Sequence, residues 1–311
     1  MKNLLLNEAI EKYYGLDRED IYVSMKMNTV VREEMKLFLD KDGFIEVNPV
    51  IISPISDPLN HPVQDPWIDY YGYRYRLTKS MIFHKQLSMV FFDKIFIFSP
   101  NIRVEPLDRK GTGRHLVEFT QLDLEVRKAK REDVMDLAEK MIEKVVKRVL
   151  EEFEPKFLNP GLKVFKRPYK KIKYLDAKSE YGDDFELKLS KEMDEPFWII
   201  DIPLEAREFY DRESEPGSGI LRDMDLIYPM GFGEAISGGE REFEYDRILE
   251  RIHRKGQNPD EFALLLEAAK KGLYPSAGFG IGIERLVRFL RGKDDISSVT
   301  LFPKKIGEFT I

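Results

Sequence analysis

Residues 103–125 read RVEPLDRKGTGRHLVEFTQLDLE, and this stretch decides how the chain is interpreted. Apolar and polar residues alternate on either side of its loop, which predicts two β-strands, at 94–105 and 117–126, joined as a hairpin. Four basic residues lie in the loop between these strands: Arg109, Lys110, Arg114 and His115. So many positive charges at one bend make the loop a candidate contact for phosphate groups.

The alternation places one set of side chains on the same side of the predicted hairpin: Arg103, Glu105, Phe119, Gln121, Asp123 and Glu125. Arg103 can direct two donors at a phosphate or a carboxylate. Phe119 offers a flat face to a planar ligand, and Asp123 can hold an ammonium group. A salt-bridged surface hairpin would show the same pattern, so the hairpin alone leaves both interpretations open.

A glycine-rich strand running into a helix is predicted at 278–289, GFGIGIERLVRF. Gly280 and Gly282 allow a ligand to approach the backbone closely, and Arg285 near the helix start can project toward the same space. Glycines that only pack a tight strand would give the same sequence, so this segment is a weak signal by itself.

Oxygen-bearing side chains gather in a third segment, DMDLIYPMGFGEAISGGERE at 223–242. Asp225, Glu234 and Ser237 are ligands of the kind that Mg²⁺ prefers, and Arg241 can bind a carboxylate. An acidic loop with a Gly-Gly turn is the structural alternative. Together the three segments supply arginines, an aromatic face, acids and glycines, which suit nucleoside triphosphate chemistry without a Walker pattern.

Composition narrows the class of protein. The chain has 311 residues, a net charge of −6 and 42% hydrophobic residues, which suits one large domain or two modest ones. The absence of cysteine excludes disulfides, thiolate zinc sites and a cysteine nucleophile. The four histidines show no metal-ligand spacing, and no apolar run approaches the roughly 18 residues of a membrane span. We expect a cytoplasmic protein with no membrane partner.

The remaining pattern predicts an α+β fold, in which helices flank an antiparallel sheet. Helices are expected at 24–40, at 131–153, within 241–256 and after a short strand in 74–92. Strands are expected at 43–54, where Pro49 favours an edge or an interface, and at 197–210. The mixed, polar stretch at about 155–195 is predicted to be an insertion.

Three segments resemble, in order, the three motifs of class II aminoacyl-tRNA synthetases. GFIEVNPVIISP at 43–54 looks like motif 1, which implies a homodimer through this segment. Residues 103–125 look like motif 2 of the aspartyl and asparaginyl branch, above all in RH..EFTQLDLE, and GFGIGIERL looks like motif 3. The resemblance runs from about Ser24 to the end of the chain and implies the class II antiparallel sheet flanked by helices.

The resemblance also implies a role for each matching residue. Arg103 and Arg285 would be the catalytic arginines, with Arg103 on the α-phosphate and the reacting carboxylate, and Arg285 on the γ-phosphate. The implied ATP-binding set is Arg103, Glu105, Arg114, His115, Leu116, Phe119, Gly282 and Arg285. Glu234, Ser237 and, with a longer spacing, Asp225 would hold Mg²⁺. The implied amino-acid site is Ser80, Lys85, Asp123 and Arg241, with Lys85 and Arg241 clamping a free carboxylate and Asp123 taking the amino group.

Residues 1–23 precede the motif 1 region, and so short an extension cannot build the anticodon-binding barrel of aspartyl- and asparaginyl-tRNA synthetases. We therefore expect one catalytic domain over 1–311 that works without tRNA. The carboxylate clamp favours L-aspartate, and ammonia is the expected acceptor, free in solution because no cysteine nucleophile can release it from glutamine. The chain thus resembles archaeal asparagine synthetases related to asparaginyl-tRNA synthetase, which implies asparagine, AMP and pyrophosphate as products.

Asparagine synthesis requires activation of the β-carboxylate, so aspartate would lie with its α-carboxylate in the Lys85–Arg241 clamp. Two alternatives stay open. The first is a compact aspartyl- or asparaginyl-tRNA synthetase. The second is a non-catalytic paralogue that binds an amino acid, against which the presence of both Arg103 and Arg285 weighs.

Overall fold

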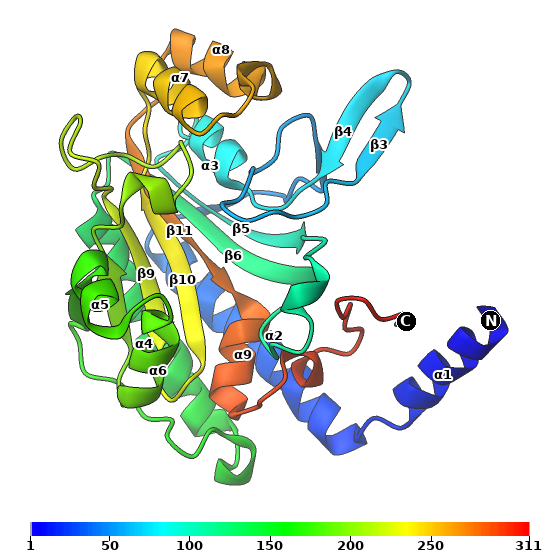
Figure 1. Cartoon of the computed structure of the whole chain (residues 1–311). Coiled ribbons are helices and arrows are strands. Elements are labelled where there is room, and N and C mark those ends of the chain that lie inside the picture. The colour runs from blue at the N-terminus through cyan, green and yellow to red at the C-terminus, as the bar shows by residue number, and fades with distance from the viewer. Residues whose placement is uncertain (1, 311) are drawn as a thin grey trace.

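The predicted hairpin lies within a large sheet. The computed structural model describes residues 2–310, and in it β5 (Lys94–Ile102) pairs with β6 (Glu118–Arg127) (Figure 1). The sheet has eight strands in the order β1-β5-β6-β11-β10-β9-β8-β7. The other strands are β1 (Ile45–Glu46), β7 (Lys170–Lys173), β8 (Phe197–Ile200), β9 (Asp223–Tyr228), β10 (Gly233–Glu240) and β11 (Ser276–Gly282). Only the two end pairs, β1–β5 and β7–β8, are parallel, so the α+β prediction is confirmed.

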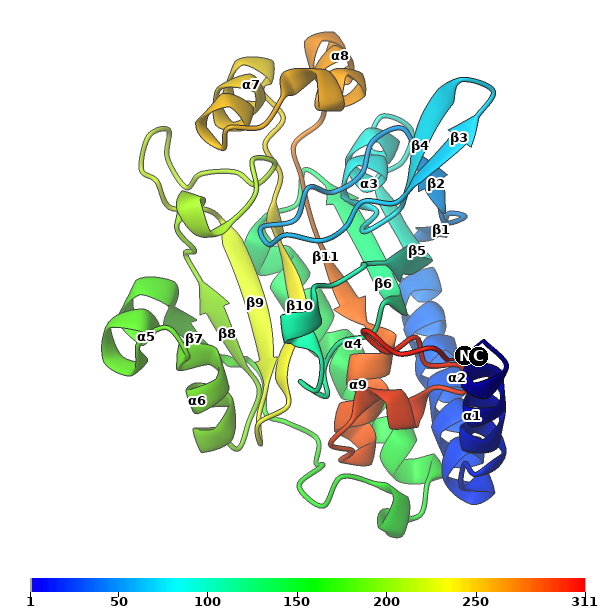
Figure 2. The same cartoon turned by 45° about the vertical axis from the view of Figure 1, so that its right-hand side comes forward.

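Three helices cover one face of this sheet: α2 (Arg18–Lys41), α4 (Arg131–Glu152) and α9 (Ile283–Arg291) (Figures 1 and 2). Side chains alternate along β6, so Leu122 and Leu124 pack into the core beneath these helices. Asp123, between them in sequence, points to the opposite face and lines a cavity there. The helices thus bury one face of the sheet and leave the other for chemistry.

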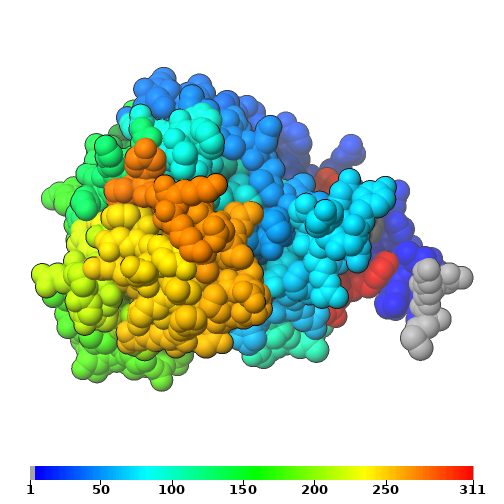
Figure 3. Space-filling view, turned by 90° about the horizontal axis from the view of Figure 1, so that it is seen from above, coloured from blue at the N-terminus to red at the C-terminus, as the bar shows by residue number. Residues whose placement is uncertain are grey.

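A second, smaller core lies at one end of the sheet, where α3 (Ile82–Ser88) packs with α7 (Tyr245–Arg254) and α8 (Ala263–Lys271). Beside it stands a three-stranded sheet made of β2 (Ile52–Ser53), β4 (Tyr73–Leu77) and β3 (Trp67–Tyr70). Figure 3, which views the molecule from this end, shows α7 and α8 next to the β3–β4 hairpin. No helix in residues 2–310 is long and apolar enough to cross a membrane.

The N-terminal segment is helical throughout most of its length. Helix α1 (Lys2–Tyr14) projects beside the C-terminal segment, and the ring of Tyr13 stacks on that of Phe302 with centroids 5.7 Å apart (Figures 1 and 2). Helix α2 begins at Arg18 rather than at residue 24, because Asp17 caps it by accepting a hydrogen bond from the Asp20 amide at 2.7 Å. The predicted helix at 24–40 was therefore too short.

Two predicted strands were wrong in their extent. The segment 43–54 is divided between β1 and β2, which belong to different sheets, with Pro49 in the break. The strand expected at 197–210 ends at Ile200, because the next residue, Asp201, takes a positive φ of 58°.

The segment 223–242 forms a β-hairpin, β9–β10, rather than a lead into a helix. Because β10 continues to Glu240, α7 begins only at Tyr245 and not within the preceding charged residues. Residues 155–195 form β7, α5 (Tyr174–Tyr181) and α6 (Phe185–Glu192), which extend one edge of the sheet and pack α6 against β9 and β10. That this stretch is an insertion stays a prediction.

The glycines of β11 make room for carboxylates of β6. A Cβ atom on Gly278 would lie 2.2 Å from Glu125 Oε2 and 2.2 Å from the Leu124 carbonyl oxygen. We expect Gly278→Ala to destabilise the protein by about 1–3 kcal/mol, because the backbone oxygen cannot move aside. Gly282→Ala is the control, since its Cβ would meet only ordinary contacts with Arg285 at 3.6 Å. Urea unfolding should show a lower midpoint for Gly278→Ala alone, and equal midpoints for the two variants would contradict this explanation.

Candidate functional site

A cavity of about 320 Å³ lies on the open face of the large sheet. Of the residues predicted from sequence, it is lined by Ser80, Lys85, Arg103, Glu105, His115, Asp123, Asp225, Glu234, Ser237, Arg241 and Arg285. A second, narrower cavity adjoins it and adds Arg114, Leu116, Phe119 and Gly282. Every residue of the implied ATP, metal and amino-acid sites therefore lines one of the two cavities, and Arg103, His115 and Arg285 line both. Lys110 of the basic loop and Glu125 of the hairpin line neither.

The narrow cavity combines an aromatic face with positive charge. The guanidinium of Arg103 lies 5.1 Å from the centre of the Phe119 ring, and its Nε donates to the Lys79 carbonyl oxygen at 3.0 Å. Among residues 2–310, no carboxylate forms an ion pair with Arg103. Its positive charge is held in place by the backbone and stays open to an anionic ligand.

Glu105 lines this cavity and contacts His61, whose Nε2 is 3.0 Å from Glu105 Oε2. Burial alone would raise the pKa of Glu105, but the hydrogen bond and charge of His61, with the nearby Arg103, outweigh it and hold that pKa below its usual range. Glu105 is therefore an ionised acceptor at neutral pH.

His115 lies among positive charges. Its Nδ1 is 2.6 Å from Thr112 Oγ1, and Arg285 and Arg114 lie close by. Burial, followed by the charges of Arg285 and Arg114, lowers the pKa of His115 to about 4, so its imidazole is neutral at pH 7.

We expect the imidazole signals of His115 to titrate with a midpoint near pH 4 in NMR spectra, with His115→Gln used to assign them. Because the folded-state pKa lies below the ordinary value of 6.5, the neutral imidazole favours folding above pH 6.5. That contribution is lost as the pH falls from 6.5 toward 4, so the loss of stability with acid should be smaller in His115→Gln. A midpoint near 6.5 would contradict the burial of this ring among arginines.

The oxygen ligands predicted for a metal meet on β9 and β10. Ser237 lies opposite Asp225, and an irregularity between Glu234 and Ile236 shifts the register by one residue. Residues three apart on a regular strand point to opposite faces, so this bulge brings Glu234 and Ser237 to the same cavity. Arg285 Nη1 lies 3.3 Å from Glu234 Oε1, which joins the metal candidates to the arginine of α9.

Asp225 is only partly paired. Arg207 Nη2 lies 2.5 Å from Asp225 Oδ2, whereas Asp225 Oδ1 is buried without a hydrogen-bond partner. Glu186 of α6 faces the same place, and burial, with the charges of Asp225 and Glu234, raises its pKa to about 7. Within residues 2–310, no three carboxylate or imidazole groups are arranged to hold a metal by themselves.

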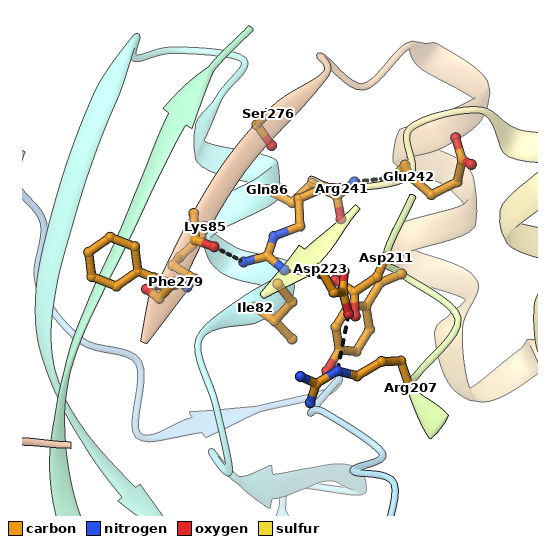
Figure 4. Close-up of polar contacts among 12 residues, drawn as sticks. Ile82, Lys85, Gln86, Arg207, Asp211, Asp223, Arg241, Glu242, Ser276 and Phe279 are labelled. Atoms are coloured by element: carbon orange, nitrogen blue, oxygen red, sulfur yellow. Dashed lines mark hydrogen bonds and ion pairs between the residues drawn. The ribbon is translucent and has the colours of Figure 1, made fainter. Parts of the chain in front are cut away.

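The two cations predicted to clamp a carboxylate, Lys85 and Arg241, are buried and line the large cavity (Figure 4). Lys85 Nζ lies 2.8 Å from Asp123 Oδ1 and donates to the Phe279 carbonyl oxygen at 3.2 Å. Arg241 donates to Glu125 at 3.2 Å and to Asp211 at 2.8 Å. Both cations are paired with carboxylates of the protein, so a substrate carboxylate would have to share their donors.

Several cavity residues were not identified from sequence: Asp57, His61, Glu186, Arg207, Glu208, Asp211 and Asp223. Of these, Arg207 and Glu208 come from the stretch predicted as one long strand at 197–210, Asp211 directly follows that stretch, and Asp223 begins β9. The signal available was the density of charge in EAREFYDRE at 205–213, a few residues beyond the buried strand β8. Charged residues beyond the end of a buried strand suit a binding loop better than a continued strand.

Comparisons with known proteins agree with this geometry. Residues 6–306 match the family described as tRNA synthetases class II (D, K and N). An aspartate–tRNA(Asp/Asn) ligase of Sulfurisphaera tokodaii is 31% identical over 94% of this chain and 71% of its own, and that of Methanopyrus kandleri is 32% identical over 93% and 69%. The crystal structure of asparaginyl-tRNA synthetase from Pyrococcus horikoshii, complexed with asparaginyl-adenylate, superposes with a TM-score of 0.84 at 26% identity, over 94% of this chain and 70% of that one.

The chain therefore belongs to the class II tRNA synthetase family of the D, K and N type. Its α+β architecture matches the fold of these structural relatives. The relatives above are named as tRNA ligases or synthetases, so they favour the tRNA-ligase alternative over the asparagine synthetase that we expected from sequence. They also give no support to our expectation that tRNA is not a partner.

Proposed function

We propose that the protein activates aspartate with ATP, forming an aspartyl-adenylate and releasing pyrophosphate. The observation that carries this proposal is the position of Arg103, an arginine without an ion-pair partner among residues 2–310, where the aromatic cavity joins the cavity with Lys85 and Arg241. Such an arginine can bind the α-phosphate and the reacting carboxylate together and stabilise the charge that builds up between them.

The other residues fit the parts of ATP. The adenine would lie against Phe119, with Glu105 and the backbone near Leu116 as hydrogen-bonding groups, and Gly282 admits its close approach. Arg114, His115 and Arg285 would then surround the phosphate tail. His115 is neutral in this site and would act as a hydrogen-bond donor rather than as a charge.

The acidic end of the cavity fits Mg²⁺. Mg²⁺ in nucleotide sites is held by one or two carboxylates, by waters and by phosphate oxygens. Glu234, Asp225 and Ser237 supply such a partial set, and the unpartnered Asp225 Oδ1 is an available oxygen. When bound with ATP, the ion would neutralise phosphate charge and favour the departure of pyrophosphate.

Aspartate is the preferred amino acid because Lys85 and Arg241 place two cationic groups in the lining of the cavity. Asparagine would present a neutral amide, which needs an acceptor as well as a donor. Asp123 lies beside Lys85, and its Oδ2 is buried without a hydrogen-bond partner, so it is the candidate acceptor for the amino group.

The acceptor that the comparisons favour is the 3′ end of a tRNA, since aspartate–tRNA(Asp/Asn) ligases are among the relatives. Transfer would join the activated carboxyl group to a ribose hydroxyl and release AMP. In this case the α-carboxylate is activated, and the β-carboxylate lies near Lys85 and Arg241.

Ammonia is the second candidate acceptor, and the acidic lining of the cavity favours it. The carboxylates of Asp57, Glu208, Asp211 and Asp223 lie on that lining and can hold a cation. Neutral ammonia would attack the acyl carbon, forming the C–N bond as the bond between that carbon and the phosphate oxygen breaks. The products are asparagine and AMP, and the β-carboxylate must then be the activated one.

Two reactions with labelled aspartate, ATP and Mg²⁺ distinguish the acceptors. The first contains total tRNA without ammonium, and the second contains ammonium chloride without RNA. Acid-precipitable label in the first supports the tRNA ligase, whereas asparagine formed in step with AMP in the second supports the synthetase. Label in neither product, with ATP and aspartate consumed in neither, would contradict both and favour the non-catalytic alternative.

We also propose a homodimer through the motif 1 region. Phe91 is 81% exposed, and Ile45 and Ile51 are each about half exposed, all near the β1 edge of the sheet. Apolar side chains of this size suit an interface between two copies. We expect a dimer in analytical ultracentrifugation and a shift toward monomer for Phe91→Glu. A monomeric native protein at micromolar concentration would overturn the proposal.

A further inference from the structure

Four carboxylates form one wall of the large cavity, here called the acidic wall: Asp57, Glu208, Asp211 and Asp223. They come from the loop after β2, from the loop after β8 and from the start of β9, so the fold brings them together from distant parts of the sequence. All four are at least nine-tenths buried. Figure 4 shows Asp211 and Asp223 side by side between Arg241 and Arg207.

The acidic wall is incompletely paired. Asp223 has an ion pair with Arg207 through Oδ2, at 3.1 Å, but its Oδ1 is buried without a hydrogen-bond partner and the residue is only 1% exposed. Asp57 accepts hydrogen bonds from the Tyr210 hydroxyl at 3.1 and 3.2 Å, and this donor carries no charge.

Glu208, like Asp57, is paired only with a neutral donor. It accepts a hydrogen bond from the Gln257 amide at 2.9 Å, again a neutral donor, and among residues 2–310 no cation lies within ion-pair distance of it or of Asp57. Burying carboxylates with neutral partners and an unpaired oxygen destabilises the folded protein. A cationic ligand that only donates hydrogen bonds would relieve that cost.

The chemistry of the wall selects the ligand. A divalent metal is disfavoured, since no three carboxylate or imidazole groups in residues 2–310 have the arrangement of a metal site. The amino group of aspartate already has a candidate acceptor in Asp123, which lies 2.8 Å from Lys85 and is not part of the acidic wall. A small cation with several N–H donors and no acceptor matches what remains, and the ammonium ion has these properties.

We propose that the acidic wall binds the ammonium ion that serves as nitrogen donor, with Asp223 as its principal ligand. The carboxylate of Asp223 takes one proton from the bound ion, and the neutral ammonia so formed attacks the acyl carbon as the bond to the phosphate oxygen breaks and AMP leaves. The second proton that the nitrogen loses on forming the amide passes to solvent. The inference rests on aspartate activation and on the second candidate acceptor. It goes further by assigning the part of the cavity in which ammonia is collected. A tRNA ligase has to bind only the ammonium group of its amino acid and uses no free ammonium ion. An ammonium site at the acidic wall would therefore favour ammonia over tRNA as the acceptor.

The test compares two nitrogen nucleophiles. Hydroxylamine is mostly uncharged at pH 8 and needs no cation site, whereas ammonia is present there mainly as ammonium. Asp223→Asn replaces the ionisable carboxyl group by an amide of nearly the same shape, and Asp183→Asn on the exposed surface is the matched control. We expect Asp223→Asn to lower kcat/KM for ammonium at least tenfold relative to kcat/KM for hydroxylamine, and the control to keep the native ratio. Glu208→Gln gives an independent second variant if Asp223→Asn does not fold.

The outcomes separate the claims. An unchanged ratio of the two nucleophiles in both wall variants overturns the ammonium site. Native protein that supports aspartate-dependent pyrophosphate exchange but forms no asparagine also overturns it, while aspartate activation stands. Native protein without exchange overturns the proposed function itself and the ammonium site with it.

Discussion

Replacing Arg103 with glutamine is expected to slow aspartate-dependent exchange of pyrophosphate into ATP by about 10³-fold. The reason is that Arg103 is a guanidinium without an ion-pair partner in residues 2–310, held by the Lys79 carbonyl oxygen where the two cavities meet. Glutamine keeps a donor but loses the charge and the fork, and the loss of one oriented donor at developing charge costs about 10²–10³ in rate. Initial rates at saturating ATP measure the effect.

The control is Arg74→Gln. Like Arg103, Arg74 lies over an aromatic ring, and its guanidinium carbon is 5.4 Å from the centre of the Trp67 ring. Unlike Arg103, it lines neither of the two cavities. It should keep the native exchange rate. Comparable rates for Arg103→Gln and the native protein would mean that the junction of the cavities is not the reacting centre.

Replacing Arg241 with methionine is expected to abolish aspartate-dependent exchange and to destabilise the fold by about 3–5 kcal/mol. Arg241 is 3% exposed and forms ion pairs with both Glu125 and Asp211. The substitution therefore leaves two buried carboxylates without their counter-ion. Chemical unfolding measures the loss of stability, and exchange at increasing aspartate concentration measures the loss of substrate binding.

The two effects of Arg241 can be separated. A triple variant with Arg241→Met, Glu125→Gln and Asp211→Asn removes the stranded charges together with the arginine. It should recover most of the lost stability without recovering aspartate-dependent exchange. Recovery of exchange as well would show that Arg241 acts only as a structural counter-ion and does not bind the substrate.

The sequence predicted the site best where regular alternation fixes the direction of side chains. Asp123 and Leu122 on β6 point to opposite faces, so the cavity face and the core face could be assigned from a period of two. The same rule failed on β10, where the bulge between Glu234 and Ile236 reverses the direction of all later side chains. The spacing of Glu234 and Ser237 suits either a helix or a bulged strand, and the sequence did not show the pairing partner β9.

Irregular segments account for what was missed. Asp211 and Glu208 reach the cavity from a loop with no periodic pattern, so neither their direction nor their burial could be inferred. The ion pair between Lys85 and Asp123 could not be predicted from the sequence either, because it depends on the contact between α3 and β6. Local pattern predicts strands and faces, whereas contacts between distant segments decide which charges remain available.

The measurement that tests the central claim most directly is pyrophosphate exchange into ATP with the pure protein, Mg²⁺ and one amino acid at a time, without RNA and without ammonium. We predict exchange that depends on L-aspartate and is much weaker with L-asparagine, because Lys85 and Arg241 lie where the free carboxylate would bind. Exchange supported by asparagine alone, or by neither amino acid, would contradict the proposed activation of aspartate.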